Sequence, residues 1–320
     1  MRKTSKIYVA GHRGLVGSAI VNSLKKKGFS KIILRTRSQL DLTKQIKVNN
    51  FFKKNKPEIV IIAAAKVGGI YANNKYQANF IYENLMIQNN LINSSFENKV
   101  KKVIFLGSSC IYPKYSKQPI KEDYLLSGEL EKTNISYAVA KISGLVMCNS
   151  YNMQYNYRTD FRCLMPTNLY GPGDNYHGLN SHVIPALIKR FHNAKIKKKK
   201  SIKVWGNGLA KREFLFSEDL AEAVILILKL SKQRYKKILS NNINHINIGS
   251  GQEYTIKNLA KIISNIVGFK GKIEFDKSKP NGTMRKFLCN RIMKKIGWGP
   301  SVKLKDGIIK TYEEFKKINS

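Results

Sequence analysis

Short apolar runs alternate with longer amphipathic segments through the first half of the chain. The runs have the length and β-branched composition of buried strands, and the longer segments carry apolar residues at helical spacing. The predicted strands span residues 6–10, 31–34, 58–62, 102–106 and 159–164. The predicted helices span residues 15–27, 44–54, 78–97 and 137–155. This alternation predicts an α/β fold with a doubly wound, Rossmann-like parallel sheet that has helices on both faces.

The alternation ends after Pro166, where segments rich in glycine, proline and asparagine begin. We expect a second, smaller α/β lobe to start there. Residues 217–230 nevertheless predict another apolar helix, and residues 245–248 predict another buried strand. The chain is therefore expected to return to the sheet before it finishes in the small lobe. The expected boundaries are residues 1–170 with 217–249 for the first domain, and residues 171–216 with 250–320 for the second lobe.

The sequence carries a formal net charge of +38, with 58 basic and 20 acidic residues. Such a charge alone favours a nucleic-acid or membrane-surface partner. Only 11 of the basic residues are arginine, however, and the lysine-rich runs at 25–27, 53–56 and 197–200 lie at predicted helix ends or turns. No helix-turn-helix, zinc-finger or RNP pattern accompanies the charge. We therefore expect no nucleic-acid partner, although the positive field would attract a polyanionic substrate.

The four cysteines are Cys110, Cys148, Cys163 and Cys289, and they form neither a CxxC pair nor a disulfide framework. This spacing favours a reducing, cytoplasmic environment and gives no indication of a metal site. The first residues contain too short an apolar run for a signal peptide. The longest apolar runs also fall well below the roughly 20 residues that a membrane span requires, so we expect a soluble protein without a membrane partner.

Three glycines follow the first predicted strand in the segment Gly11-His-Arg-Gly14-Leu-Val-Gly17. Gly11 permits a tight turn, Gly14 lets the backbone approach a pyrophosphate, and Gly17 lets the helix pack closely on the strand. The N-terminus of the following helix adds amide donors and partial positive charge. A turn that needs glycine only for backbone reasons is the alternative. The strand before the motif and the helix after it favour a dinucleotide site.

The end of the second predicted strand indicates which dinucleotide binds. Folds that select NAD usually place an acidic residue about 20 positions after the glycine motif. Here Arg35, Thr36 and Arg37 occupy that place. Arg37, together with Arg13 in the glycine motif, offers guanidinium groups that suit a 2′-phosphate. We therefore expect NADP(H) as the cofactor, the alternative being that these arginines are ordinary surface cations.

A hydroxyl, a phenol and an ammonium group have the spacing of a carbonyl-reducing site. Tyr137 and Lys141 are four residues apart at the start of a predicted helix and so share one face. Tyrosine titrates near 10, so the positive charges of Lys141 and of the oxidised nicotinamide are expected to lower its pKa for acid–base work. Ser108 follows the strand at 102–106, at the carboxyl edge where ligands of such sheets bind. The motif YxxxK alone is common, but the three motifs occur in order and in the expected contexts.

Six segments at separate places in the chain carry a more specific resemblance. They are Gly11-His-Arg-Gly, Ala63-Ala-Ala-Lys-Val-Gly-Gly-Ile, Gly107-Ser-Ser-Cys-Ile-Tyr-Pro, Pro166-Thr-Asn-Leu-Tyr-Gly-Pro, Ser181-His-Val-Ile-Pro-Ala and Arg212-Glu-Phe. With these segments, the chain resembles the GDP-L-fucose synthase family of the extended short-chain dehydrogenases/reductases, from about Lys6 to the C-terminal helix. The thiol at Cys110 and the imidazole at His182 are the most specific features, because the wider family does not require them.

The resemblance implies 3,5-epimerisation of GDP-4-keto-6-deoxy-D-mannose followed by NADPH-dependent reduction at C4, giving GDP-L-fucose. It implies that Cys110 and His182 are the acid/base pair beside the catalytic Ser108, Tyr137 and Lys141; a thiol and an imidazole titrate near enough to neutrality for this. The residues expected at the GDP-sugar are Arg190, Trp205, Arg212 and Lys286. The residues expected at the cofactor are Gly11, Arg13, Gly14, Leu15, Val16, Gly17, Arg37, Leu106, Gly107, Ser108, Ser109, Tyr137, Lys141, Pro166, Thr167, Asn168, Leu169 and His182.

Several alternatives remain at this stage. Cys110 and Trp205 are also compatible with buried packing roles, and His182 with a helix start. The chain departs from the family pattern at Asn281, where an aspartate is usual, and at Cys289. Another epimerase or reductase of the same family is the first alternative function; a dehydratase is disfavoured because no acidic pair flanks Ser108. A non-catalytic NADP-binding or nucleic-acid-associated module is a distant one. By resemblance to the family, we also expect a homodimer.

Overall fold

The computed structural model describes residues 1–177, 181–239, 243–278 and 283–319. Its main element is a six-stranded, fully parallel sheet with the order β2-β1-β3-β4-β5-β9. The strands are β1 (Ile7–Ala10), β2 (Ile32–Ile33), β3 (Ile59–Ile62), β4 (Lys102–Leu106), β5 (Asp160–Pro166) and β9 (His245–Ile248). The predicted fold class, a doubly wound parallel sheet, is confirmed.

Successive strand residues point to opposite faces of this sheet and enter two separate cores. Val9 and Ile61 pack against α1 (Leu15–Lys26) and α7 (Ser217–Lys229). Tyr8 and Val60 pack on the other face, which is covered by α2 (Gln45–Asn55), α4 (Gln77–Glu97) and α5 (Ile135–Gln154). Burial on both faces explains why these strands are apolar throughout.

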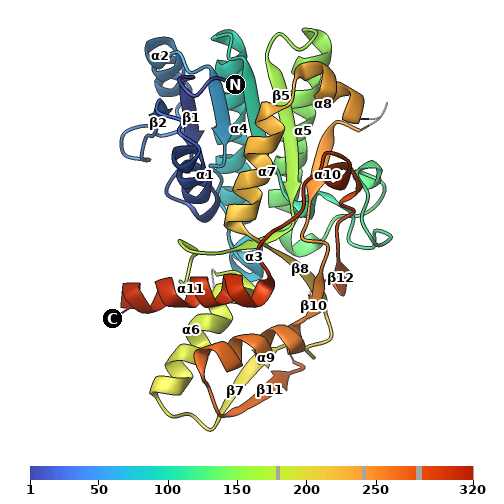
Figure 1. The fold of residues 1–320 in the computed structure, drawn as a ribbon. Helices are drawn as coiled ribbons and strands as arrows, with labels where there is room; N and C mark the ends of the chain where they lie inside the picture. Colours follow the sequence, from blue (N-terminus) through green and yellow to red (C-terminus); the bar gives the residue numbers. More distant parts are fainter. Residues whose placement is uncertain (178–180, 240–242, 279–282, 320) are drawn as a thin grey trace.

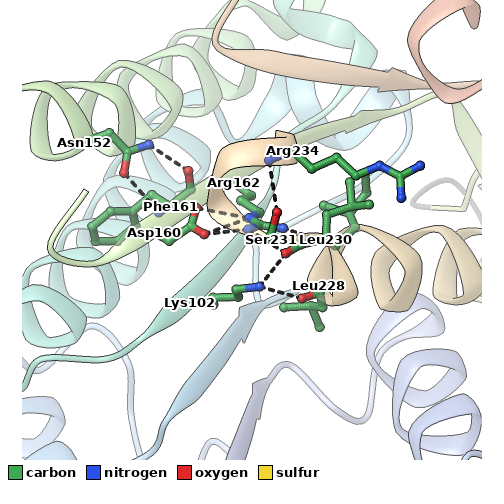
Figure 2. Close-up of polar contacts among 10 residues, drawn as sticks. Lys102, Asn152, Asp160, Phe161, Arg162, Leu228, Leu230, Ser231 and Arg234 are labelled. Atoms are coloured by element: carbon green, nitrogen blue, oxygen red, sulfur yellow. Dashed lines mark hydrogen bonds and ion pairs between the residues drawn. The ribbon is translucent and has the colours of Figure 1, made fainter. Parts of the chain in front are cut away.

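A buried arginine and a half-buried lysine hold the end of α7, the helix with which the chain returns to the large sheet (Figure 2). Arg162 on β5 is fully buried; it pairs with Asp160 at 2.6 Å and donates to the carbonyls of Ile227 and Leu230. Lys102 on β4 donates to Leu230 O at 2.7 Å. The C-terminal carbonyls of a helix lack partners within the helix and carry partial negative charge. The two cations therefore anchor α7 to the amino end of the sheet.

The second lobe lies below the sheet in Figure 1 and has its own core. It contains α6 (Val183–Ile196), α9 (Ile256–Val267) and α11 (Leu304–Asn319), with a two-stranded sheet of β7 (Ser201–Trp205) and β11 (Lys272–Asp276). Phe191, Ile263 and Phe315 pack together at its centre. The strand order separates a large sheet from this second lobe. The exact residue boundaries between the two parts stay a prediction.

A short mixed sheet lies between the two lobes (Figure 1). It contains β6 (Asn168–Tyr170), β8 (Lys211–Phe216), β10 (Glu253–Thr255) and β12 (Arg285–Lys286). β10 and β12 have only two or three residues, and β8 begins with the polar Lys211 and Arg212, so these strands lack the full apolar pattern that predicts strands. The register of this sheet matters for the site, because Lys286 on β12 lies opposite Arg212 on β8.

The remaining elements are short. They are α3 (Ile70–Lys75), α8 (Lys232–Ile238), α10 (Arg291–Lys295) and the 3₁₀ turns η1 (Ser109–Ile111), η2 (Glu122–Tyr124) and η3 (Lys132–Asn134). The predicted bounds of β4 and β9 match the structure, whereas β2 contains only two residues. None of the helices that the structure describes is long and apolar enough to cross a membrane.

Candidate active site

The glycine motif forms the turn between β1 and α1. Gly11 adopts φ +86°, a left-handed conformation that favours glycine, and a Cβ there would lie 2.6 Å from Ala64 N. A Cβ on Gly17 would overlap the carbonyl of Gly11. Gly14 is the N-cap of α1 and has no side chain to occupy the first-turn amides. These amides and the exposed backbone of Gly14 suit a phosphate group, so the turn fits a dinucleotide.

Leu15 and Val16 occupy the first turn of α1, and both are half-buried. The exposed Arg13 and Arg37 follow the ends of the neighbouring parallel strands β1 and β2, so they lie at the same edge of the sheet. Arg37 is positioned by Glu83 of α4, with Nη2 3.6 Å from Oε2. The two arginines retain exposed guanidinium groups that suit a 2′-phosphate.

Glu83 also forms an ion pair with Lys66, just beyond β3. The sequence analysis assigned no role to Lys66. Asn84, the residue next to Glu83, accepts a hydrogen bond from Lys66 N at 2.9 Å and donates to Lys66 O at 3.0 Å. These contacts tie the loop after β3 to α4, beside the arginine of the predicted cofactor site.

Ser108 and Cys110 lie in the turn that follows β4. The Ser108 hydroxyl accepts a hydrogen bond from Cys110 N at 3.2 Å and so caps η1. Gly107 leaves no room for a side chain, because a Cβ would overlap Met165. Ser109 is buried, whereas Ser108 and Cys110 are half-buried. The turn therefore presents a hydroxyl and a thiol at the carboxyl edge of the sheet.

Tyr137 and Lys141 share one face of α5, with Lys141 Nζ 5.9 Å from the centre of the Tyr137 ring. Lys141 donates to Leu106 O at 2.8 Å, which ties α5 to the end of β4. Ser108 hydrogen-bonds the Tyr137 side chain. The structure thus brings Ser108, Tyr137 and Lys141 together as the spacing predicted.

The electrostatics of this pair differ from the expectation. Burial lowers the pKa of Lys141 to about 8. Burial also raises the pKa of Tyr137, with a further increase from Cys110 that the Ser108 hydrogen bond partly offsets. Desolvation of the phenolate thus outweighs, in this structure, the lowering of the Tyr137 pKa that was expected from Lys141. Tyr137 is a protonated phenol at neutral pH.

Two nitrogen donors from distant parts of the chain meet the Cys110 sulfur. Asn134, at the end of η3, places Nδ2 3.4 Å from Sγ. Lys286 on β12 places Nζ 3.8 Å from Sγ. Neither contact was predicted: Lys286 was expected at the GDP-sugar, and Asn134 was not singled out. The register of β8 and β12 also brings Arg212 to this side, where burial lowers the pKa of the guanidinium and Glu131 offsets part of that effect.

The other expected substrate residues lie on the second lobe. Arg190 on α6 is half-buried and donates to the carbonyl of Lys203 on β7, and burial lowers its pKa. Trp205 ends β7 with 44% of its surface exposed, so it is not a core residue of the strand. The contacts of the described residues do not join either side chain to the cluster around Cys110.

His182 is the N-cap of α6. The residue is exposed, yet many atoms surround the ring, and the resulting desolvation lowers the pKa of the imidazole. No hydrogen bond between described residues links His182 to Cys110. A neutral imidazole at this helix start retains one donor and one acceptor nitrogen.

The last group of expected cofactor residues follows β5. Thr167 N donates to Ile248 O at 3.0 Å, and Asn168 Nδ2 donates to Glu213 O at 2.9 Å. Pro166 is buried at the end of β5, and Leu169 is a half-buried residue of β6. These four residues, like Leu106 and Gly107, lie at the carboxyl edge of the sheet.

Of the two departures from the family pattern, Asn281 lies outside the described residues. Cys289 is half-buried, and its amide donates to Ile120 O at 2.8 Å. Across the described ranges, no group of three or more histidine, cysteine and acidic residues is arranged to hold a metal ion.

Comparisons with known proteins agree with this geometry. Residues 7–249 match the model of the NAD dependent epimerase/dehydratase family. The chain is 51% identical to "GDP-L-fucose synthase 1" of Arabidopsis thaliana, over 98% of this chain and 94% of that protein. It is 48% identical to "GDP-L-fucose synthase" of Escherichia coli K12, over 97% and 96% respectively. Among solved structures, a GDP-mannoheptose C4 reductase from Campylobacter jejuni with NADP bound has a TM-score of 0.88 at 43% identity, covering 99% of each chain.

Proposed function

The chain belongs to the NAD dependent epimerase/dehydratase family, and on that premise we propose that it acts as a GDP-L-fucose synthase. It would epimerise GDP-4-keto-6-deoxy-D-mannose at C3 and C5 and then reduce C4 with NADPH. The observation that carries this proposal is the Cys110 thiol beside Ser108 and Tyr137, because the thiol adds ring epimerisation to a carbonyl-reducing site. The two relatives named GDP-L-fucose synthase, each about half identical over nearly the whole chain, support it.

NADP(H) is the proposed cofactor. The glycine turn holds the pyrophosphate, and Arg13 and Arg37 hold the 2′-phosphate. Residues 106–109 and 166–169, with His182, line the remainder of the site. When bound, NADPH supplies the hydride that C4 of the sugar receives. The NADP-bound relative from Campylobacter jejuni supports this choice.

Ser108 and Tyr137 bind the C4 ketone oxygen in the proposed reaction. A ketone at C4 acidifies the hydrogens on C3 and C5, because removal of either proton gives an enolate. The two hydroxyl donors stabilise the negative oxygen of that enolate in the manner of an oxyanion hole. Cys110 and His182 exchange protons at the two carbons, as an acid/base pair on opposite faces of the ring.

Tyr137 then protonates the C4 oxygen during reduction. Its raised pKa keeps the proton on the phenol at neutral pH, which suits an acid. Lys141 holds α5 against Leu106 O and positions Tyr137 over the ketone. Arg190, Arg212 and Lys286 bind the diphosphate and the sugar, and Trp205 offers an exposed ring to the nucleotide.

The test mixes the purified protein with GDP-4-keto-6-deoxy-D-mannose and NADPH. Loss of reduced-nicotinamide absorbance and identification of GDP-L-fucose as the product support the proposal. Reduction that leaves C3 and C5 uninverted contradicts the epimerase part. No oxidation of NADPH contradicts the proposal as a whole.

A GDP-heptose 4-reductase is the second candidate, favoured by the high structural similarity to the GDP-mannoheptose C4 reductase. The two candidates differ in the substituent at C6 of the sugar. A comparison of kcat/KM for a 6-deoxy GDP-4-keto-hexose and a GDP-4-keto-heptose distinguishes them, and the higher value identifies the substrate class.

A cytoplasmic homodimer is part of the same proposal, with no nucleic-acid or membrane partner. The four free cysteines suit a reducing compartment. Val139, Val146 and Met153 are exposed at seven-residue spacing along α5 and form an apolar stripe. The exposed Tyr82 lies on α4, which packs against α5. A second copy of this chain, with the same stripe, is the proposed occupant of this face.

A further inference from the structure

We propose that Lys286 and Asn134 hold the Cys110 sulfur as a thiolate and so prepare it for its part in the acid/base pair. This inference rests on the proposed function and deepens it. It gives Lys286 a positioning role at the thiol in addition to its expected contact with the GDP-sugar.

The geometry around the sulfur carries the inference. The ammonium of Lys286 lies 3.8 Å from Sγ, and the amide nitrogen of Asn134 lies 3.4 Å from it. Both are donors, and neither can deprotonate the thiol. The phenol of Tyr137 on α5 also lies near enough to interact with the sulfur, and it is neutral at neutral pH. One positive charge and one hydrogen bond thus favour the anionic form of the sulfur.

The backbone fixes the place of Lys286. Its strand, β12, has only two residues, but hydrogen bonds on both sides hold the segment around it. Ile120 N donates to Phe287 O at 2.7 Å, and Leu288 N donates to the buried carboxylate of Glu213 at 3.1 Å. On the other side of Lys286, Arg285 pairs with Glu253 at 2.8 Å. The ammonium therefore faces Cys110 from an anchored strand.

A thiolate at Cys110 also explains the state of Tyr137. Negative charge on Sγ disfavours a phenolate nearby, and Cys110 raises the pKa of Tyr137 in addition to the larger effect of burial. The sulfur is then charged and acts as a base, while the phenol stays protonated and acts as a donor. Burial and the neighbouring sulfur thus favour the protonated phenol, and Lys286 favours the anionic sulfur.

The proposed inversion at a ring carbon needs only the sugar, the two side chains and solvent protons. The C–H bond next to the ketone breaks, its proton bonds to Sγ, and its electron pair moves into the enolate. The enolate oxygen accepts hydrogen bonds from Tyr137 and Ser108. His182 delivers a proton to the opposite face of the carbon, the carbonyl reforms, and exchange with solvent restores both side chains.

Alkylation of Cys110 by iodoacetamide tests the inference without any substrate, because the thiolate is the reactive form. The rate at neutral pH is measured on the full-length protein by peptide mass spectrometry, with Cys289 of the same chain as an internal reference. Lys286→Met is expected to slow the reaction of Cys110 by about tenfold or more, as loss of a nearby opposite charge shifts such equilibria by at least about one pH unit. Asn134→Ala is expected to give a smaller decrease.

Two variants separate charge from packing. Lys286→Arg keeps the cation and is expected to retain most of the wild-type rate. Lys257→Met removes an exposed cation of α9 instead and is expected to leave the rate unchanged. Loss of bulk at residue 286 alone would speed alkylation by opening access. An unchanged or faster reaction of Cys110 in Lys286→Met would therefore overturn the inference, as would a failure of Lys286→Arg to restore it.

Failure of the inference and failure of the proposed function are distinguishable. If the wild-type protein does not turn over GDP-4-keto-6-deoxy-D-mannose, the proposed function is wrong whatever the alkylation rates are. If turnover is normal but the Lys286→Met protein keeps a fast-reacting Cys110, the function stands and the role of Lys286 is wrong.

Discussion

Lys141 lies at the candidate catalytic site, but its buried environment disfavours the charge on its ammonium group. Its side chain is 4% exposed, and burial lowers the pKa of the ammonium to about 8. Its ammonium donates a hydrogen bond to the carbonyl of Leu106. The charged form is therefore less stable in the folded protein than in water. In return, the hydrogen bond to Leu106 O ties α5 to the end of β4, where Tyr137 and Ser108 meet.

Replacement of Lys141 by Met is expected to stabilise the fold and abolish reduction. A pKa of about 8 against 10.5 in the unfolded chain corresponds to a destabilisation on the order of 1–3 kcal/mol below pH 8. In the wild type the unfolded state binds more protons between these values, so the free energy of unfolding rises with pH across that window. Urea unfolding at several pH values checks this, with Lys47→Met on the exposed face of α2 as the control.

A variant with no gain in stability at neutral pH would contradict the assignment of a strained, buried ammonium. So would a gain that persists unchanged above pH 10.5, because the lysine is neutral in both states there.

Replacement of Arg13 and Arg37 together by Ala is expected to discriminate between the two dinucleotides. Each charge-assisted hydrogen bond contributes about 1.5–3 kcal/mol, so NADPH affinity should fall by at least about tenfold while NADH affinity changes little. Fluorescence titration with both cofactors gives the ratio of the two dissociation constants. Equal losses for NADPH and NADH would exclude a 2′-phosphate site at these arginines.

Sequence spacing located some site residues and missed others for a physical reason. Tyr137 and Lys141 share a helical turn, and Ser108 ends a strand, so local periodicity is sufficient to bring them to one edge. Lys286 and Cys110 meet only because β12 pairs with β8. The two residues lie 176 positions apart, and no periodic signal connects them. The raised pKa of Tyr137 depends on burial, which spacing does not report.

Helix α7 shows how a distant segment is fixed to the sheet. Arg162 is fully buried, and Asp160, Ile227 and Leu230 satisfy its guanidinium. Its position above the Tyr235 ring adds a cation–π contact at 4.5 Å. Removal of one member of such a pair leaves a buried charge and open carbonyls, which destabilises more than the pair itself stabilises.

Arg162→Met is therefore expected to lower the free energy of unfolding by about 3–5 kcal/mol. The double variant Asp160→Asn with Arg162→Met removes the stranded carboxylate and is expected to recover part of this loss. Chemical denaturation of the three proteins provides the comparison. Equal stability of the single and double variants would show that the buried carboxylate is not the source of the effect.

The sequence predicted strands correctly where burial on both faces imposes an apolar pattern. The apolar strands β4 and β9 were predicted with their observed bounds. The strands of the intermediate sheet were missed, because Lys211, Arg212 and the residues of β12 are polar and partly exposed. Their pairing is set by tertiary contacts between lobes, which a local pattern does not contain.

The candidate functional side chains of the whole molecule lie on two parts, the parallel sheet and the second lobe. The carboxyl edge of the sheet carries the glycine turn, Ser108 and Cys110, while the second lobe carries Arg190 and Trp205. The short sheet between them brings Arg212 and Lys286 to the reacting groups. A polyanionic nucleotide sugar is favoured at such a site by the net charge of +38.

The apolar stripe on α5 yields a prediction about assembly. Val146→Glu combined with Met153→Glu places two charges on the proposed dimer face and is expected to convert a dimer to a monomer. Sedimentation equilibrium measures the mass, and Ile46→Glu, at a more exposed apolar residue of α2, is the control. A wild-type monomer, or a dimer that persists in the double variant, would contradict this interface.

Solvent exchange tests the central claim most directly. GDP-4-keto-6-deoxy-D-mannose is incubated with the protein in D₂O without reduced cofactor, and deuterium at C3 and C5 is followed by NMR. The account predicts that the wild type introduces deuterium at both carbons, and that Cys110→Ala introduces little at either. Wild-type protein that exchanges neither carbon, or a Cys110→Ala protein that exchanges both at the normal rate, would contradict it.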